Sequence, residues 1–316
     1  MNLRIAVLDR GRGKYLGTGG ADAILSTRVR AGTLSREDLK AAADLCVRAW
    51  AYDHLTQSLV HEKLFEDAPE EATAALAVRH EETLLGIVGL CARGPTAWIK
   101  LAAADPAKRR QGVATALLAQ AESWARSTGA RTLRLMDHPG NYLTPGMDVR
   151  YAEAIEFLAR HGFTVAGENE NLLLPLPPPA AARAPMHGYE LRRARHADAA
   201  AVTALAREFS PAWAYEAGRA MDQDQPTVHV ALQRGEPVSF AAHDGNNRGT
   251  GAFGPAGTLP AHRGRGLGQA LLRACLHDIA RAGHGQAVIP WVSDTTLYAQ
   301  FGAVQGGRYR VLVKNL

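Results

Sequence analysis

The chain of 316 residues contains one domain-sized repeat. Seven residues of the first half recur in the second half at a constant offset of 154 positions, as in 263 minus 109. A constant offset over several identities indicates an internal repeat, and this unit is far longer than the repeats of solenoid proteins. We therefore expect two copies of one fold. The paired residues are Pro106 and Pro260, Arg109 and Arg263, Gly112 and Gly266, Ala116 and Ala270, Leu117 and Leu271, Leu118 and Leu272, and Gly129 and Gly283.

The boundary between the two copies is predicted within a segment rich in proline and alanine, residues 175–188. No hydrophobic period runs through this segment, as is typical of a semi-rigid linker. On each side of it a basic strand, at residues 28–31 and 189–194, precedes an amphipathic helix, at residues 36–50 and 197–209. The predicted organisation is a leader (1–26), a first domain (27–174), the linker (175–188) and a second domain (189–316).

The composition limits the classes of function. With 47% hydrophobic and 21% charged residues, the chain is expected to be an ordinary globular protein. Its net charge of +5 comes from arginines interspersed among acids, without the runs typical of nucleic-acid binding. Three widely spaced cysteines, Cys46, Cys91 and Cys275, form neither a disulfide framework nor a CxxC metal site. No apolar run approaches the roughly 18 residues that span a bilayer, so we expect a cytoplasmic protein with no membrane or nucleic-acid partner.

A glycine-rich turn in the second half is typical of phosphate binding. The turn, Arg263 to Gly268, follows an apolar stretch and leads into a helical pattern with a buried stripe. The first amides of such a helix have no intrahelical acceptor, and the helix dipole is positive at this end. A diphosphate would therefore be held mainly by the backbone. Glycine leaves room for that approach, while Arg263 and Arg265 add positive charge.

The spacing within this turn distinguishes between two kinds of phosphate ligand. A dinucleotide fingerprint has the order GxGxxG and an acidic residue about 20 positions further on, and the turn has neither feature. The order RxxGxG, with a proline three residues before the arginine, instead resembles motif A of the GNAT superfamily of N-acetyltransferases, which bind acetyl-CoA. Residues 263–268 fit this motif, and residues 109–114 fit its variant that ends in alanine.

The resemblance implies the α/β fold class, with two tandem GNAT folds that are each a splayed mixed β-sheet flanked by helices. The pantetheine arm of acetyl-CoA would lie between two strands that part, with the thioester near Thr258 and Leu259 in the second half and near Leu101 and Ala103 in the first. The cofactor-binding residues implied for the second half are Leu259, Arg263, Gly264, Arg265, Gly266, Leu267, Gly268 and Gln269. Those implied for the first half are Leu101, Ala103, Arg109, Arg110, Gln111, Gly112, Val113, Ala114 and Thr115.

The two halves differ at the position of the family's catalytic acid, a tyrosine four residues before a glycine in a late helix. The second half has Tyr298 before Gly302, and its phenol would protonate the departing CoA thiolate. The first half has Leu158 before Gly162. The resemblance therefore implies that the second half is the catalytic copy, although tyrosine is also common as a packing residue.

The base and the acceptor pocket are less sharply defined by the sequence. The strand before the second motif contains no acid or histidine, so a base would come from elsewhere. Glu216 and Asp294 are the candidate bases, each acting through water, although either would also fit a solvated surface. Trp213 and Tyr215, next to Glu216, are candidate residues of the substrate pocket.

An insertion distinguishes the first half. The offset between the halves falls from 154 to 140 after the motif, so 14 extra residues lie within residues 137–151. Two Pro-Gly pairs predict an ordered loop near the acyl end of the first site, where Asn141, Tyr142 and Asp148 would line a substrate pocket. Such a loop resembles one in acetyltransferases that act on amino sugars.

The sequence thus predicts an acetyl-CoA-dependent N-acetyltransferase that acts on a primary amine of a small molecule by direct attack, without a metal. An amino sugar is one class of acceptor that fits. The alternative is that the N-terminal half, or the whole chain, is a non-catalytic acyl-CoA-binding or sensing module. The identity of the amine, and the choice between monomer and homodimer, stay open because acceptor pockets in this fold are built from variable loops.

Overall fold

The computed structural model describes residues 29–179, 186–292 and 295–316, and the predicted leader lies outside them. Contacts divide the chain into two compact units, one of Met1–Leu133 with Asn315–Leu316 and the other of Arg134–Lys314. Within the described residues, no helix combines the length and the apolar character needed to cross a membrane.

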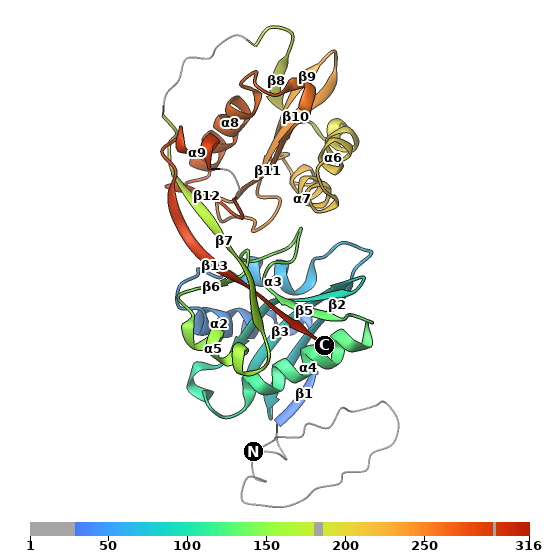
Figure 1. Ribbon diagram of the computed structural model, residues 1–316, viewed down its shortest axis with the longest axis vertical. Helices are drawn as coiled ribbons and strands as arrows, with labels where there is room; N and C mark the ends of the chain where they lie inside the picture. The colour runs from blue at the N-terminus through green and yellow to red at the C-terminus, as the bar shows by residue number, and fades with distance from the viewer. Residues whose placement is uncertain (1–28, 180–185, 293–294) are drawn as a thin grey trace, which may run out of the picture. The chain divides into compact units, whose positions relative to one another are not determined.

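The same order of elements occurs twice along the chain (Figure 1). The motif helices α4 (Val113–Ser127) and α8 (Leu267–Arg281) have 15 residues each and start at the offset found in the sequence. The other elements of the first repeat are β1 (Val29–Thr33), η1 (Arg36–Asp38), α2 (Leu39–Ala49), α3 (Gln57–Phe65), β2 (Ala72–His80), β3 (Thr83–Arg93), β4 (Thr96–Ala104), η2 (Pro106–Lys108), β5 (Thr132–Leu135), β6 (Met147–Asp148), α5 (Ala152–Arg160) and β7 (Thr164–Pro175). Those of the second are β8 (Glu190–Arg193), η3 (His196–Asp198), α6 (Ala199–Arg207), α7 (Pro211–Met221), β9 (Val228–Gln233), β10 (Glu236–His243), β11 (Phe253–Thr258), η4 (Pro260–His262), β12 (Gln286–Ile289), α9 (Thr296–Ala299) and β13 (Val304–Asn315).

In the first unit, β1 to β4 form an antiparallel sheet whose inner strand β3 is buried along almost its whole length. Two glycines let helices approach β3 closely. A Cβ atom at Gly86 would lie 2.7 Å from Cδ1 of Leu117 in α4, and one at Gly89 would lie 2.9 Å from Cδ2 of Leu64 in α3. Because helices pack on this strand through both positions, β3 is apolar between its end residues Thr83 and Arg93.

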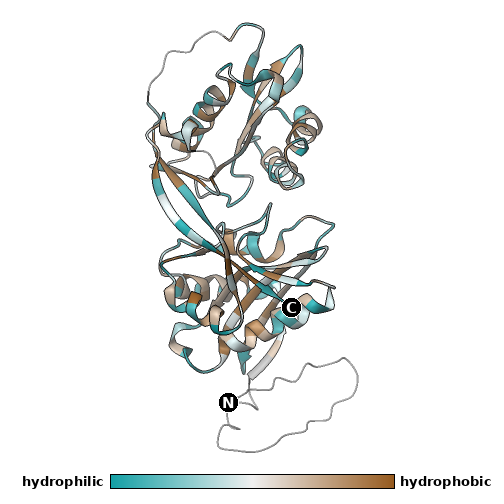
Figure 2. Cartoon of the chain, viewed as in Figure 1, coloured by the Kyte–Doolittle hydropathy of each residue, from teal (hydrophilic) through white to brown (hydrophobic). Residues whose placement is uncertain are grey.

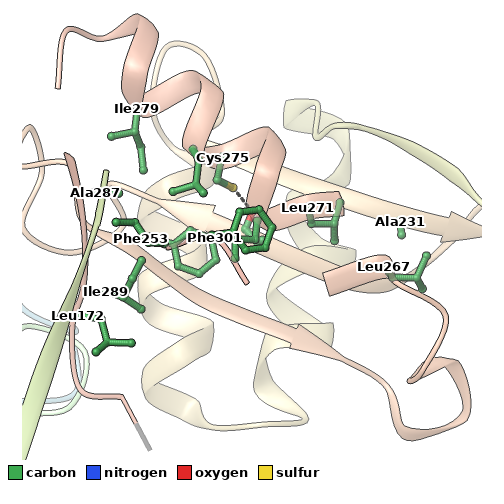
Figure 3. Close-up of a cluster of buried hydrophobic side chains, with 14 of the residues drawn as sticks. Leu172, Ala231, Phe253, Leu267, Leu271, Cys275, Ile279, Ala287, Ile289 and Phe301 are labelled. Carbon is green, nitrogen blue, oxygen red and sulfur yellow. Dashed lines mark hydrogen bonds between the residues drawn. The ribbon is translucent and has the colours of Figure 1, made fainter. Parts of the chain in front are cut away.

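In the second unit, β8 to β11 form an antiparallel sheet in the order β11-β10-β9-β8. Helix α8 covers one face of this sheet, and α6 and α7 cover the other (Figure 1). Side chains alternate between the faces, as expected for strands, since Ala231 and Ala241 pack in the α8 core whereas Val230 and Phe240 pack in the α6–α7 core. Figure 3 shows the α8 core, and Figure 2 shows hydrophobic residues along the strands and the helices that cover them.

Strands of both repeats also pair with one another in this unit. β7, the last strand of the first repeat, pairs with β12 of the second through residues 172–175 and with β13 over most of its length. β6 also pairs with β13. Because β7 lies among strands of the second repeat, the division by contacts falls after Leu133, inside the first repeat. The domain boundaries at residues 174 and 189 describe the repeat in the sequence and stay a prediction.

The end of the chain belongs to the first unit. The amide of Leu316 donates to the carbonyl oxygen of Arg131 at 2.9 Å, and both residues lie in that unit. The last two residues are therefore part of the first unit.

A charged network fixes α8 to the sheet of the second unit. Oδ2 of Asp278 lies 2.6 Å from Nε2 of His229 and 2.5 Å from Nη2 of Arg193. The same oxygen lies 3.8 Å from Nε2 of His243, whose Nδ1 lies 2.8 Å from Oδ2 of Asp244. Burial raises the pKa of Asp278, but the two histidines and Arg193 outweigh it and hold that pKa below its usual range. Burial lowers the pKa of His243, but the two aspartates raise it above its usual value.

Asp278→Asn is expected to lower the free energy of unfolding by about 3 kcal/mol, because it leaves partly buried cations without their anion. The depressed pKa of Asp278 contributes stability above about pH 4 that is lost as the pH falls, and the raised pKa of His243 contributes stability below about pH 6.5 that is lost as the pH rises. The deficit should therefore be largest between these values, measured by urea unfolding at pH 3, 5.5 and 8.5. The exposed Asp222→Asn is the control, and a deficit that does not change with pH would contradict this account.

Candidate active site

Both motif helices begin at a glycine in the left-handed backbone conformation. Gly112, before α4, has φ 83° and Gly266, before α8, has φ 78°, and neither helix has a side-chain cap. The first intrahelical bonds run from the amide of Ala116 to Gly112 at 2.9 Å and from the amide of Ala270 to Gly266 at 3.1 Å. The amides between each glycine and these positions have no intrahelical acceptor, so both helix starts are preorganised to bind an anion.

The space over the second helix start is open. A Cβ atom at Gly264 would meet no other atom within 4 Å, one at Gly268 would meet the hydroxyl of Thr258 at 4.0 Å, and one at Gly266 would meet only Cε of Met186, at 3.5 Å. Nε of Arg263 donates to the carbonyl oxygen of Thr258 at 3.1 Å, which closes the turn, and the side chain of Arg265 is exposed. The turn thus offers its amides and two guanidinium groups to an anion.

Neighbouring side chains hold this turn in place. Nδ1 of His262 lies 2.9 Å from the hydroxyl of Tyr189, so this histidine is a structural residue of the turn. The side chain of Gln269, a predicted cofactor residue, is hydrogen-bonded to Gln300. The side chain of Leu267 is buried in the α8 core, which leaves its amide for a ligand.

The first helix start has the same construction. Asp105 caps the preceding η2 through the amide of Ala107 at 2.9 Å, and Arg110 takes a left-handed conformation with φ 64°. Among the predicted residues, Arg109, Arg110, Gln111 and Thr115 are exposed, Gly112 and Ala114 are half-buried, and Leu101, Ala103 and Val113 are buried. The predicted cofactor residues of each repeat therefore gather around its own helix start and the strand before it.

The strand before α8 has a free edge. β11 is the edge strand of its sheet, and it joins β12 through a parallel bridge between Ala252 and Val288. In the described part of the chain, the two strands belong to separate sheets beyond this bridge. The amide of Leu259 donates back to Val238 in β10 at 3.0 Å. Because backbone groups alternate along a strand, the amides of Thr258 and Ala256 point to the free edge.

Tyr298 lies at the far end of β11. Its half-buried ring packs edge-on against Phe253, with ring centroids 6.3 Å apart and planes at 75°. Phe253 and Thr258 are five residues apart, which is roughly 16 Å along a strand. The structure therefore brings Tyr298 to the point where β11 and β12 meet, and not to the thioester position predicted at Thr258 and Leu259. The equivalent Leu158 is a buried residue of α5.

The candidate acceptor residues of α7 lie at different depths. Glu216 is only 5% exposed, so it is not a solvated surface carboxylate. Trp213 packs on Phe209 with ring centroids 5.5 Å apart, and Tyr215 lies under the guanidinium of Arg219 at 5.6 Å. The other candidate base, Asp294, lies outside the described residues.

The insertion of the first repeat is an ordered and buried loop, as its Pro-Gly pairs predict. Asn141, Tyr142 and Asp148 are 0%, 7% and 2% exposed. Asp148 accepts hydrogen bonds from the amide of Arg150 at 2.8 Å and from its Nη2 at 2.6 Å, so it stabilises the loop itself. Tyr142, predicted for a pocket of the first half, lies in the second unit against Trp291, with ring centroids 5.3 Å apart.

Sequence reasoning missed Trp291 and the asparagines Asn246 and Asn247, which hold this loop. The side chain of Asn246 donates to the carbonyl oxygen of Tyr142 at 3.0 Å, and that of Asn247 donates to Leu143 at 2.9 Å. Their signal in the sequence was limited to a turn rich in glycine and asparagine and to a tryptophan after a proline.

The fold and the site define an α/β protein with two repeats, each of which presents a helix start preorganised for an anion. The model of the Acetyltransferase (GNAT) family matches residues 39–163 and 197–303. The chain therefore belongs to this family, whose members generally use acetyl-CoA, and it has the predicted tandem architecture. A comparison with curated proteins found no match.

Solved structures share this fold at low sequence identity. A GCN5-related glucosamine N-acetyltransferase region of a fungal multi-domain GH3 β-N-acetylglucosaminidase is 16% identical, with a TM-score of 0.72 over 90% of this chain and 38% of that chain. A GCN5-related N-acetyltransferase from Sphaerobacter thermophilus is 18% identical, with a TM-score of 0.67 over 91% and 96% of the two chains. A tandem GNAT protein from the clavulanic acid biosynthesis pathway is 20% identical, with a TM-score of 0.68 over 91% and 98%.

Gly266→Glu is expected to weaken acetyl-CoA binding to the second repeat by more than about tenfold, because it puts a carboxylate beside a diphosphate at the helix start. Calorimetric titration with acetyl-CoA measures this. The matched control is Gly283→Glu, which strains a left-handed glycine (φ 96°) at the other end of the same helix. Wild-type affinity in Gly266→Glu, or equal losses in both variants, would contradict the assignment of this helix start as the anion site.

Proposed function

We propose that the chain is an acetyl-CoA-dependent N-acetyltransferase that acts on a primary amine of a small molecule, with the second repeat as its catalytic copy. The observation that carries the proposal is the combination, in that repeat, of an anion-binding helix start, a free strand edge leading away from it and the phenol of Tyr298 at the end of that edge. Leu158, at the corresponding position of the first repeat, has no proton to donate.

Acetyl-CoA supplies the reaction with an acyl group activated as a thioester. The amides of Leu267, Gly268 and Gln269 would hold its diphosphate, and the guanidinium groups of Arg263 and Arg265 would add positive charge. This arrangement fits the ligand because the space above Gly264 is open and the atom nearest to a Cβ at Gly266 is the end of the flexible Met186 side chain, at 3.5 Å.

The free edge of β11 would hold the pantetheine arm. The amides of Thr258 and Ala256 would pair with it in the way that a peptide adds to the edge of a sheet. Because Tyr298 packs at Phe253, we place the thioester beyond Thr258 and alongside Ala256. The amide of Ala256 would then stabilise negative charge on the acyl oxygen.

Tyr298 and Glu216 would divide the proton transfers. The amine attacks directly, so it must lose a proton, and Glu216 would accept that proton through water. Tyr298 would donate a proton to the thiolate as it leaves. Asp294 stays the other candidate base.

A small amine is the proposed acceptor, and amino sugars are the first class to test. The support is the likeness in fold to a region described as a glucosamine N-acetyltransferase, which by itself does not extend to the substrate. Polyamines and peptide N-termini complete the panel. A cytoplasmic location is part of the proposal and is supported by the three cysteines, which are all buried and form no disulfide.

A second proposal concerns the first repeat, as a non-catalytic acyl-CoA-binding module. Its helix start keeps the left-handed Gly112 and exposed basic residues, while its acid position holds Leu158. The two repeats must be tested in the full chain, because a fragment ending near residue 176 would leave β7 without β12 and β13.

Tyr298→Phe is expected to lower kcat by roughly 10² to 10⁴-fold, the usual contribution of general acid catalysis, while the KM for acetyl-CoA stays nearly constant. The change keeps the ring that packs on Phe253. CoA thiol release with the amine panel measures it, and the exposed Tyr52→Phe is the control. An unchanged kcat with an unchanged pH profile would make Tyr298 a packing residue.

Gly112→Glu is expected to reduce the stoichiometry from two acetyl-CoA per chain to one while turnover at the second repeat continues. Calorimetry and CoA release on the same sample measure both quantities. Gly129→Glu, at the other end of α4 with φ 82°, is the matched control. Loss of turnover together with the first binding event would instead support an acyl-CoA-sensing role of the first repeat.

A further inference from the structure

The insertion of the first repeat is anchored on the second repeat by polar contacts. Side-chain amides from the turn between β10 and β11 hold its backbone, since Asn246 binds the carbonyl oxygen of Tyr142 at 3.0 Å and Asn247 binds that of Leu143 at 2.9 Å. Both asparagines are buried, at 4% and 9% exposure. Buried hydrogen bonds of this kind are costly to break, so the loop is held in one position.

The same loop lies against α7. Gly140 has φ 104°, and a Cβ atom there would lie 3.3 Å from Cδ1 of Tyr215 and 3.8 Å from Cα of Ala212. Glycine at this position therefore lets the loop backbone approach the helix that carries Glu216. On its other side the ring of Tyr142 meets Trp291 nearly edge-on, at 89°.

The pKa of Tyr142 responds to both groups assigned to proton transfer. Burial raises the pKa of this phenol well above its usual value, the carboxylate of Glu216 raises it further, and Tyr298 adds to the effect. A hydrogen bond with the Asn246 side chain acts in the opposite direction. The phenol of Tyr142 is thus neutral at ordinary pH. The turn that holds Tyr142 through Asn246 also lies against the backbone of Glu216, since a Cβ atom at Gly245 would collide with the carbonyl oxygen of Glu216.

We propose that the insertion of the first repeat forms the acceptor-side wall of the second repeat's site, with Tyr142 as a residue that positions the acceptor. The inference rests on the proposed function of that site. It also narrows the acceptor class to compact molecules with a primary ammonium group, because a buried carboxylate such as that of Glu216 would attract a cation, as would the rings of Tyr142 and Trp291. The first repeat then contributes to catalysis without an acid of its own.

Hydrogen exchange of the full chain, with and without acetyl-CoA, tests this proposal without a known acceptor. Binding at the second repeat should slow exchange in two segments, the helix start at residues 263–272 and the loop at residues 137–148. Both effects should persist in Gly112→Glu and Gly283→Glu and disappear in Gly266→Glu.

Other outcomes separate the proposal from the function on which it rests. Protection of the helix start without protection of the loop would overturn the proposal and leave the acetyl-CoA site in place. Loop protection that disappears in Gly112→Glu and survives in Gly266→Glu would assign the loop to the first repeat's site and also overturn it. Absence of protection in both segments would reject the proposed function itself, and the inference with it.

Kinetics supply a second test, with glucosamine, spermidine and an alanyl peptide as acceptor probes. Tyr142→Ala should raise the KM for the amine by about tenfold, equivalent to about 1.4 kcal/mol, and leave the KM for acetyl-CoA unchanged. Tyr142→Phe should restore much of the affinity, because it keeps the ring against Trp291. The exposed Tyr52→Ala is the control. Equal changes in both KM values would indicate a merely structural role for Tyr142 and would overturn the proposal.

Discussion

The pairing of β7 with β13 is the constraint on which the rest of the second unit depends. β7 is the last strand of the first repeat and β13 is the last strand of the second. β7 lies between β12 and β13, so both of its partners come from the second repeat. Asn171 in β7 extends the effect to side chains, since its Nδ2 donates to the hydroxyl of Tyr309 and its Oδ1 accepts from the amide of Trp291, both at 3.0 Å. A strand of the first repeat thereby fixes the segment of the second repeat on which Tyr142 packs.

Backbone conformation, and not side-chain identity, makes the two helix starts alike. A left-handed residue costs an L-amino acid roughly 1 to 2 kcal/mol, so glycine at positions 112 and 266 sets the direction of the amides at little cost. The difference between the repeats lies elsewhere, in helices α5 and α9, where Leu158 is buried in a core and Tyr298 keeps a partly exposed ring. In the proposed function, the residues for binding and those for chemistry therefore lie in different helices.

Features set by a few consecutive residues were predictable from the sequence. The order RxxGxG determines where a helix starts and how its first amides point, and the repeat, the Pro-Gly loop and the tandem fold followed from such local patterns. The pairing of β7 with strands of the second repeat was not predictable, because strand pairing depends on contacts between residues far apart in the chain. For the same reason the sequence did not show that Tyr142 packs on Trp291 of the second repeat, and it left Glu216 open as a surface residue.

The place of the last residues in the first unit affects the order in which the protein can be assembled. Domains generally fold as they leave the ribosome, beginning with the N-terminal one. Here the first unit includes Asn315–Leu316, and the amide of Leu316 completes a hydrogen bond to Arg131 in that unit. The unit that is synthesised first consequently gains this hydrogen bond only after translation has passed through the whole second repeat.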